Sequence, residues 1–310
     1  SDQPGNPADP ESAVFGPERF VGRAGLVRNL MDRCERRQSV LVYGGPKLGK
    51  TSLLLHLQWL MTRRATSEES PSARYLDLAD DELREGLLAG RWDRSAVLLL
   101  DNCDQLVGQT SSLGTCLRAA SGNGSSVKSI VWAGGRAWRD FVRSGSHGLL
   151  SHPDPVVPAP LAILLEKEAQ TLVQPNLTAS QHAAVLAHGG THPYILKVLR
   201  CQVIVRGRGA DLSGAIRAAG ARLAPFFQAC MEGLREPVER ALLSYLVASG
   251  EPVNPREAAR ALDLPTIKPV ADTLCYLGLI SRWNLAEGAR LRANCRLFND
   301  WYLAYTDQQT

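Results

Sequence analysis

The sequence predicts an α/β fold in which a doubly wound parallel sheet is followed by a helical domain and a C-terminal domain of helices and a hairpin. Three observations predict it. Short apolar segments alternate with helical patterns as far as Pro160, strand patterns then stop, and a hairpin-like segment follows only near the end of the chain. With 310 residues, 45% of them hydrophobic, the chain is long enough for two or three cores of ordinary domain size.

Residues 1–16 are predicted to be a linker or tail, because they are rich in Pro, Gly, Ser and Asp and show no periodicity. The alternating pattern begins at Pro17, so we expect the first domain to span residues 17–160. Its expected strands are short, and the one at 96–101 is apolar as far as Leu100, which is typical of a parallel sheet covered on both faces. They are residues 39–43, 74–78, 96–101 and 129–133, with a weaker edge strand near Val156-Val157. Its expected helices are residues 24–36, 50–61, 81–88 and 113–120, the last followed by a Gly/Ser loop at 121–126.

The remainder of the chain is predicted to form two further domains, at residues 161–230 and 231–310. Helical patterns at 161–172, 180–188 and 193–205 define the first of them. The second has helical patterns at 238–248, 255–262 and 265–279, then a hairpin at 280–295 with Glu287-Gly288 at its tip, and a final helix at 297–305. Three helices and a β-ribbon predict a winged-helix domain.

Composition narrows the function classes. The net charge of +4 and the lack of a long basic cluster point to no particular partner, so a nucleic acid remains open but is not favoured. Seven cysteines are scattered and never spaced as CxxC, which predicts reduced thiols in a cytoplasmic protein and neither a disulfide framework nor a zinc site. No apolar run has bilayer length and no secretory signal opens the chain, so we expect no membrane partner.

The strongest motif is a glycine-rich phosphate cradle. It follows the strand at 39–43, opens the helix at 50–61 and has the spacing GxxxxGK[ST]. The expected nucleotide-binding residues are Gly44, Gly45, Pro46, Lys47, Leu48, Gly49, Lys50, Thr51 and Ser52. The glycines let backbone amides point at a polyphosphate, and the helix N-terminus adds a positive dipole end. We therefore predict a P-loop that binds ATP or ADP, with Lys50 on the β- and γ-phosphates and Thr51 on Mg²⁺.

A second group of candidates follows the apolar strand at 96–101. Asp101 ends that strand at the edge of the sheet where ligands bind, so it is the expected Mg²⁺-side acid, although a solvated strand-end carboxylate is the plain alternative. The next residue, Asn102, can hydrogen-bond a water molecule but cannot accept its proton. Asp104 is the candidate that could partly substitute. The sequence therefore predicts nucleotide binding with slow hydrolysis at most.

Arg136 follows the strand at 129–133 and is the third candidate. In such sheets that strand lies beside the P-loop strand, so the forked guanidinium could reach a γ-phosphate. A surface salt bridge is the alternative interpretation.

In these residues the chain resembles the STAND class of signal-transduction ATPases, in its archaeal and bacterial AAA-like branch. Phe20-Val21-Gly22-Arg23 is similar to the hydrophobic-Gly-Arg motif whose backbone meets adenine, which implicates Val21, Gly22 and Arg23. The segment 190–196 resembles a Gly-x-Pro-type motif whose proline, Pro193 here, packs on the base. The segment 297–301 is similar to the Phe-x-x-Trp ending of the winged helix in this branch.

The resemblance implies a switch in which nucleotide state controls domain opening and homo-oligomerisation, and so activates an effector, as in bacterial antiviral defence or signalling. The effector or sensor is then a domain or protein outside this chain. The main alternative is a DNA-handling AAA-like ATPase related to origin-recognition or transposition helpers. The expected recognition helix carries only Lys268 beside Asp272, and the ribbon has Arg282, Arg290 and Arg292, which is little positive charge for tracking phosphates. A nucleotide-independent scaffold and a metabolic kinase are weaker alternatives.

Overall fold

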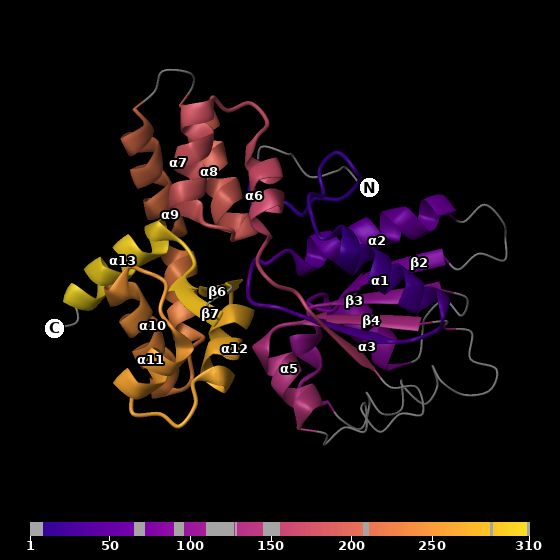
Figure 1. Ribbon diagram of the computed structural model, residues 1–310. Coiled ribbons are helices and arrows are strands. Elements are labelled where there is room, and N and C mark those ends of the chain that lie inside the picture. The colour runs from indigo at the N-terminus through magenta and orange to yellow at the C-terminus, as the bar shows by residue number, and fades with distance from the viewer. Residues whose placement is uncertain are drawn as a thin grey trace. The chain divides into compact units, whose positions relative to one another are not determined.

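The computed structural model describes residues 9–64, 72–89, 96–109, 127, 129–144, 156–206, 211–285 and 288–308 (Figure 1). The chain divides into two compact units. The first consists of Ser12–Gly45 and Gly49–Leu161, and the second of Ala162–Thr310 with the short segments Ala8–Glu11 and Pro46–Leu48. The expected helix 113–120, the loop 121–126 and Glu287 lie outside the described residues. No helix within the described ranges combines the length and apolar character needed to cross a membrane.

The first unit is built on a five-stranded sheet with the strand order β2-β3-β4-β1-β5. Its strands are β1 (Val40–Tyr43), β2 (Ser72–Asp77), β3 (Ala96–Asp101), β4 (Ser129–Gly134) and β5 (Val157–Pro160). Every pairing is parallel, which confirms the predicted parallel sheet. The P-loop strand β1 lies between β4 and β5, so the segments that follow β1, β3 and β4 emerge at one edge.

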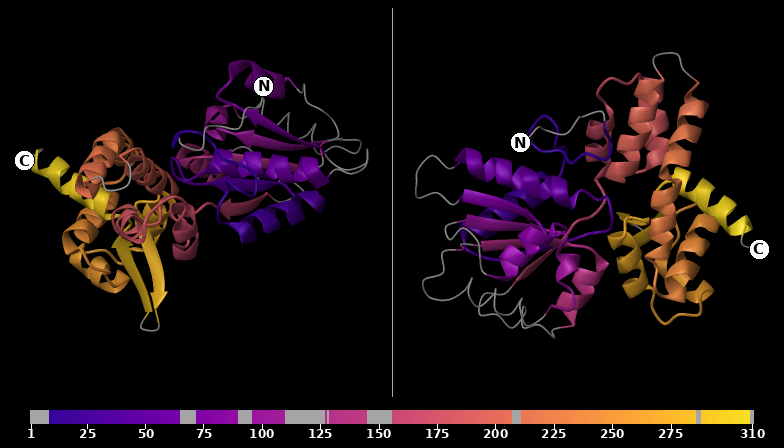
Figure 2. Two further views of the ribbon diagram at one scale, coloured as in Figure 1. Left: turned by 90° about the horizontal axis from the view of Figure 1, so that it is seen from above. Right: turned by 180° about the vertical axis from the view of Figure 1, so that it is seen from behind.

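Helices cover both faces of this sheet (Figure 2). Helices α1 (Ala24–Glu35) and α2 (Lys50–Arg64) pack on one face. On the other face, α3 (Asp81–Leu88) and α5 (Arg136–Arg143) share one apolar cluster with alternate strand residues. Leu98 and Trp132 point into that cluster, where they meet Trp138 of α5. The side chains at the alternate positions, such as Leu99, are equally buried and face α1 and α2.

Three parts of this unit differ from the sequence-based expectation. A short 3₁₀ helix, Cys103–Leu106, follows β3, and α5 follows β4 with only Gly135 between them; neither was predicted. Residues 12–16, expected within a linker, pack on α2. The Val14 amide donates to Ser52 Oγ at 3.1 Å, and the Gly16 amide donates to His56 Nδ1 at 3.2 Å.

The second unit begins with four helices: α6 (Glu166–Val173), α7 (Ala179–Gly189), α8 (Pro193–Val205) and α9 (Leu212–Glu232). Helix α6 starts five residues later than predicted. The Leu161 amide donates to Tyr43 O and continues the pairing of β5 (2.8 Å), and the Glu168 carboxylate accepts from the Leu165 amide at the true helix start (2.9 Å). Helix α9 was not predicted.

The rest of the second unit contains α10 (Pro237–Ser249), α11 (Pro255–Ala261), α12 (Lys268–Tyr276), the antiparallel hairpin of β6 (Ile280–Leu285) and β7 (Gly288–Ala293), and α13 (Arg296–Asp307). A single bridge between Val253 and Leu291 extends the hairpin. Helix α12 begins at Lys268 rather than Pro265, since the Thr266 hydroxyl accepts from the Lys268 amide (3.3 Å) and fixes the first turn there.

Candidate functional site

The P-loop closes around the ammonium group of Lys50. This side chain extends from the first residue of α2 back over the loop, where Nζ donates to the carbonyl oxygens of Gly44 and Gly45, both at 2.9 Å. Gly49 has φ +91°, a left-handed conformation that favours glycine, and a Cβ there would lie 3.1 Å from the Arg23 guanidinium. The loop therefore has the backbone geometry that the glycine spacing predicts.

Lys50 is a partly buried cation without a direct counter-ion among the described residues. Burial, the largest effect, lowers its pKa from the usual lysine value, and the charges of Asp101 and Asp104 oppose that shift. Within the described ranges no carboxylate lies within ion-pair distance of its Nζ. In the part of the chain that the structure describes, this ammonium is held by carbonyl oxygens and neutralised by no carboxylate. Such a cation favours the binding of an anion, so this site fits a polyphosphate.

Asp101 and Thr51 form the pair expected for Mg²⁺. The Thr51 hydroxyl donates to Asp101 Oδ2 at 2.6 Å, and the carboxylate is only 1% exposed. Tyr75 on the neighbouring strand donates to the same oxygen at 3.1 Å. Burial, and after it the charge of Asp101, raises the pKa of Tyr75, so this phenol stays a neutral donor. A hydroxyl and a carboxylate oxygen are the ligand types that Mg²⁺ prefers, so the pair fits the ion.

Asn102 is turned toward the end of β2. Its backbone is left-handed at φ 54°, and its Nδ2 donates to Asp77 Oδ1 at 2.7 Å. Its own amide donates to Asp101 Oδ1 at 2.9 Å. The side chain therefore offers its carbonyl oxygen to a water molecule but has no group that takes up a proton.

Asp104 serves the start of α5. Its carboxylate accepts from the Gly135 amide at 2.5 Å and from the Trp138 amide at 3.0 Å, as an N-terminal capping residue does. Both oxygens are thus engaged in structure. The predicted catalytic role of Asp104 stays a prediction, and this geometry does not favour it.

Arg136 is the first residue of α5 at the end of β4, the strand paired with the P-loop strand. Its side chain is largely buried, and its Nε lies 3.6 Å from Asp140 Oδ2. The ion pair corresponds to the alternative interpretation, but it forms in a protected position rather than on an open surface. Contact with a phosphate remains a prediction for this residue.

The expected adenine motif lies beside the P-loop. Gly22 and Arg23 both have positive φ, 81° and 59°, and together they turn the chain into α1. The Arg23 guanidinium then lies against Gly49, as described above. The structure therefore brings the motif 21–23 to the phosphate cradle, although a base contact stays a prediction.

The middle of the P-loop is partly exposed. Lys47 has φ 57°, and its Nζ forms an ion pair with Glu11 Oε2 at 2.7 Å, whereas the neighbouring Leu48 is fully buried. The pKa of Glu11 lies below its usual value. Burial of the carboxylate raises this pKa, but the hydrogen bonds that the carboxylate accepts from Lys47 and Tyr194 together lower it more. Neither Glu11 nor Tyr75 was found from the sequence.

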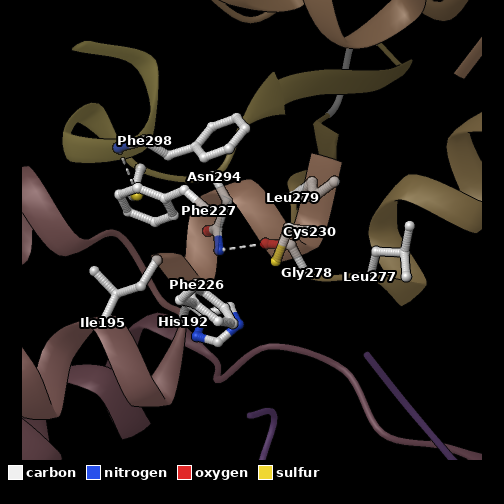
Figure 3. Close-up of a pocket in the computed structure, with 11 residues that line it drawn as sticks. His192, Ile195, Phe226, Phe227, Cys230, Leu277, Gly278, Leu279, Asn294 and Phe298 are labelled. Atoms are coloured by element: carbon white, nitrogen blue, oxygen red, sulfur yellow. Dashed lines mark hydrogen bonds between the residues drawn. The ribbon is translucent and has the colours of Figure 1, made fainter. Parts of the chain in front are cut away.

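Pro193 begins α8 in the second unit, directly after the buried His192. His192 lines a small apolar pocket, drawn in Figure 3. Its volume of roughly 10 Å³ leaves room for about one water molecule. Across it, Asn294 Nδ2 donates to Gly278 O at 3.0 Å. Gly278 has φ +77°, and a Cβ there would lie 3.0 Å from the His192 ring. The pocket is a packing feature around the Pro193 turn, and the predicted base contact of Pro193 stays a prediction.

Comparisons with known proteins agree on the fold. No protein-family model and no curated protein sequence matches this chain. Among solved structures, it is similar to the Walker-type ATPase PABY2304 of Pyrococcus abyssi, with a TM-score of 0.63 and 13% identity over 96% of this chain and 99% of that one. It is also similar to the ORC2 protein of Aeropyrum pernix, solved as ADPNP–ADP complexes, with a TM-score of 0.58 and 12% identity over 98% and 99%.

The first unit thus has the fold of P-loop ATPases, as its sheet and P-loop indicate. At these identities the likeness concerns the fold alone.

Proposed function

We propose that this chain is a nucleotide-dependent ATPase that binds ATP or ADP together with Mg²⁺. The observation that carries the proposal is the partly buried Lys50 ammonium held inside the P-loop, with the Thr51–Asp101 pair beside it. Lys50 and the loop amides hold the phosphates, Thr51 contacts the metal, and Asp101 holds it through water. When bound, the nucleotide supplies a phosphoanhydride and the metal supplies charge that neutralises its oxygens.

We expect hydrolysis to be slow. Positioning and charge stabilisation are in place, but Asn102 cannot accept a proton and the Asp104 oxygens are occupied by backbone amides. The expected turnover is below about 1 s⁻¹, the lower end of the usual kinase range. A coupled phosphate-release assay on purified protein measures it, and faster turnover contradicts this part of the proposal.

For the cellular role we favour the DNA-handling ATPase over the STAND-type switch. Its support is the likeness to the Aeropyrum ORC2 chain over nearly the whole length, together with a winged-helix-like arrangement of α10–α12 and the β6–β7 hairpin. The hairpin carries an exposed Trp283 with the Arg292 guanidinium 5.8 Å from its ring centre. On α12, by contrast, Asp272 pairs with Lys268 and with Arg282, which reduces the positive charge of that helix. We therefore expect the hairpin to make the main DNA contact.

The STAND-type switch is the second candidate. It is favoured by Asn102, because slow hydrolysis lets a bound γ-phosphate outlast a signal. On this hypothesis, nucleotide state controls oligomerisation, which in turn activates an effector outside the chain.

Duplex-DNA binding separates the two. Fluorescence anisotropy with a labelled duplex at two salt concentrations is expected to give micromolar affinity that falls steeply with salt. Arg292→Ala should weaken it several-fold, and Lys167→Ala, a change of an exposed cation on α6, should not. No measurable DNA binding, combined with ATP-dependent oligomers in size-exclusion chromatography, would favour the switch instead.

A further inference from the structure

The end of β2 places a second carboxylate beside the pair expected for Mg²⁺. Asp77 and Asp101 are the last residues of β2 and β3, and they are partners in the register of these parallel strands. Partners in register point to the same face of a sheet, and neighbouring strands lie about 4.8 Å apart. On that face, Thr51 of α2 and Tyr75 both donate to Asp101. Asp77 therefore lies at the edge of the phosphate site.

Asp77 holds Asn102 through only one of its two carboxylate oxygens. Its Oδ1 accepts from Asn102 Nδ2 at 2.7 Å and from the Ala79 amide at 2.9 Å. Within the described part of the chain, no group donates to Asp77 Oδ2 or to the side-chain carbonyl oxygen of Asn102. Both residues are half-buried, so water can reach them. The pair thus offers two acceptors to one water molecule, and one of these acceptors belongs to a carboxylate.

Two other carboxylates adjoin Asn102 in the sequence, and both are already engaged. Asp101 accepts at Oδ2 from the Thr51 and Tyr75 hydroxyls, and at Oδ1 from the Asn102 amide. Asp104 accepts with both oxygens from backbone amides at the start of α5. Of the three carboxylates, only Asp77 keeps an oxygen that no described residue serves.

We infer that Asp77 is the proton acceptor for the water that attacks the γ-phosphate, and that Asn102 positions this water. The inference rests on the proposed binding of MgATP. The water oxygen forms a bond to the γ-phosphorus, while the bond from that phosphorus to the bridging oxygen breaks. The bridging oxygen keeps the electron pair and leaves with ADP, and one water proton passes to Asp77 Oδ2. Asp77 lies one strand farther from the P-loop strand than Asp101 does, which agrees with slow turnover.

Two variants test this role, with circular dichroism to confirm that both are folded. Asp77→Asn keeps an oxygen that can accept from Asn102 but removes the group that takes up a proton. We expect phosphate release in single turnovers of bound MgATP to slow about a hundredfold, as for loss of a general base, with no loss of MgATP affinity. The double variant Asp77→Asn/Asn102→Asp exchanges the amide and the carboxylate, and it should regain most of the rate.

Asp80→Asn is the matched control, because Asp80 is an exposed cap of α3 in the same segment and Asn caps a helix equally well; its rate should not change. A wild-type rate in Asp77→Asn overturns the inference, as does a slow rate that the folded double variant fails to restore. A higher Mg²⁺ requirement for ATP binding in Asp77→Asn would show that Asp77 serves the metal instead.

The inference and the proposed function fail in different ways. If the wild-type protein binds no MgATP, the proposed function itself is wrong. If it binds MgATP but releases phosphate no faster than Asp77→Asn does, only the role of Asp77 is wrong.

Discussion

At the scale of single residues, the Asp101 carboxylate is organised by partners from three segments. Thr51 comes from α2, Tyr75 from β2, and the Asn102 amide from the turn after β3. The carboxylate is therefore oriented before any ligand arrives. Tyr75 and the Asn102 amide, which are not expected to touch the metal, tune its binding by holding this carboxylate in place.

Removing the Tyr75 hydroxyl tests that arrangement. Tyr75→Phe deletes one hydrogen bond to Asp101 and leaves the ring in place. We therefore expect the free energy of unfolding to fall by about 1 kcal/mol, and the Mg²⁺ concentration at the midpoint of nucleotide binding to rise roughly tenfold. Tyr245→Phe on α10 is the matched control. Titration of Mg²⁺ against a fixed ATP concentration measures the effect, and an unchanged midpoint in Tyr75→Phe would contradict the role given to this phenol.

The P-loop, Asp101 and the motif 21–23 could be predicted from the sequence because each lies in one short contiguous pattern. Tyr75 and Asp77 could not, since they reach the site from a strand more than twenty positions earlier. A signal was present: Asp77 ends β2 as Asp101 ends β3, and the two are paired in register. Only the strand order reveals that pairing.

At the scale of elements, the start of α5 depends on Asp104. Asp104→Ala removes the acceptor of two partly buried amides, and we expect it to lower the free energy of unfolding by about 1–3 kcal/mol. Asp104→Asn keeps an acceptor and should lose less stability while leaving ATP turnover within a factor of about three, whereas loss of a general base costs about a hundredfold or more. Urea unfolding and a turnover assay measure the pair. A hundredfold drop in Asp104→Asn would restore the catalytic prediction for this residue.

The missed elements have identifiable physical causes. Helix α9 contains Pro225 and is rich in small residues, so its sequence lacks the apolar spacing that marked the other helices. Helix α5 follows two glycines that a sequence pattern assigns to a loop. Gly134 is nevertheless required by packing, because a Cβ there would lie 2.6 Å from Trp138. Residues 12–16 were expected within a linker because residues 1–16 are rich in Pro, Gly, Ser and Asp and show no periodicity. Only the hydrogen bonds from the Val14 and Gly16 amides to Ser52 and His56 show that this segment is folded.

At the scale of the whole molecule, the chain has two compact units of different construction. The first is a parallel sheet with helices on both faces, and this layered construction was predictable because apolar strands alternate with amphipathic helices. The second is helical with one hairpin, and its element types, apart from α9, were also expected. The division of the second unit into a lid and a winged helix stays a prediction, because it concerns boundaries rather than elements.

The central claim is that Lys50 holds a polyphosphate. The most direct measurement is calorimetric titration of MgATP and MgADP into the wild-type protein and into Lys50→Ala, with circular dichroism to confirm that both are folded. We predict saturable binding to the wild type and no measurable binding to Lys50→Ala. Within the described residues, no other cation donates to the P-loop carbonyl oxygens of Gly44 and Gly45. Equal affinity of the two folded proteins for ATP would contradict the account.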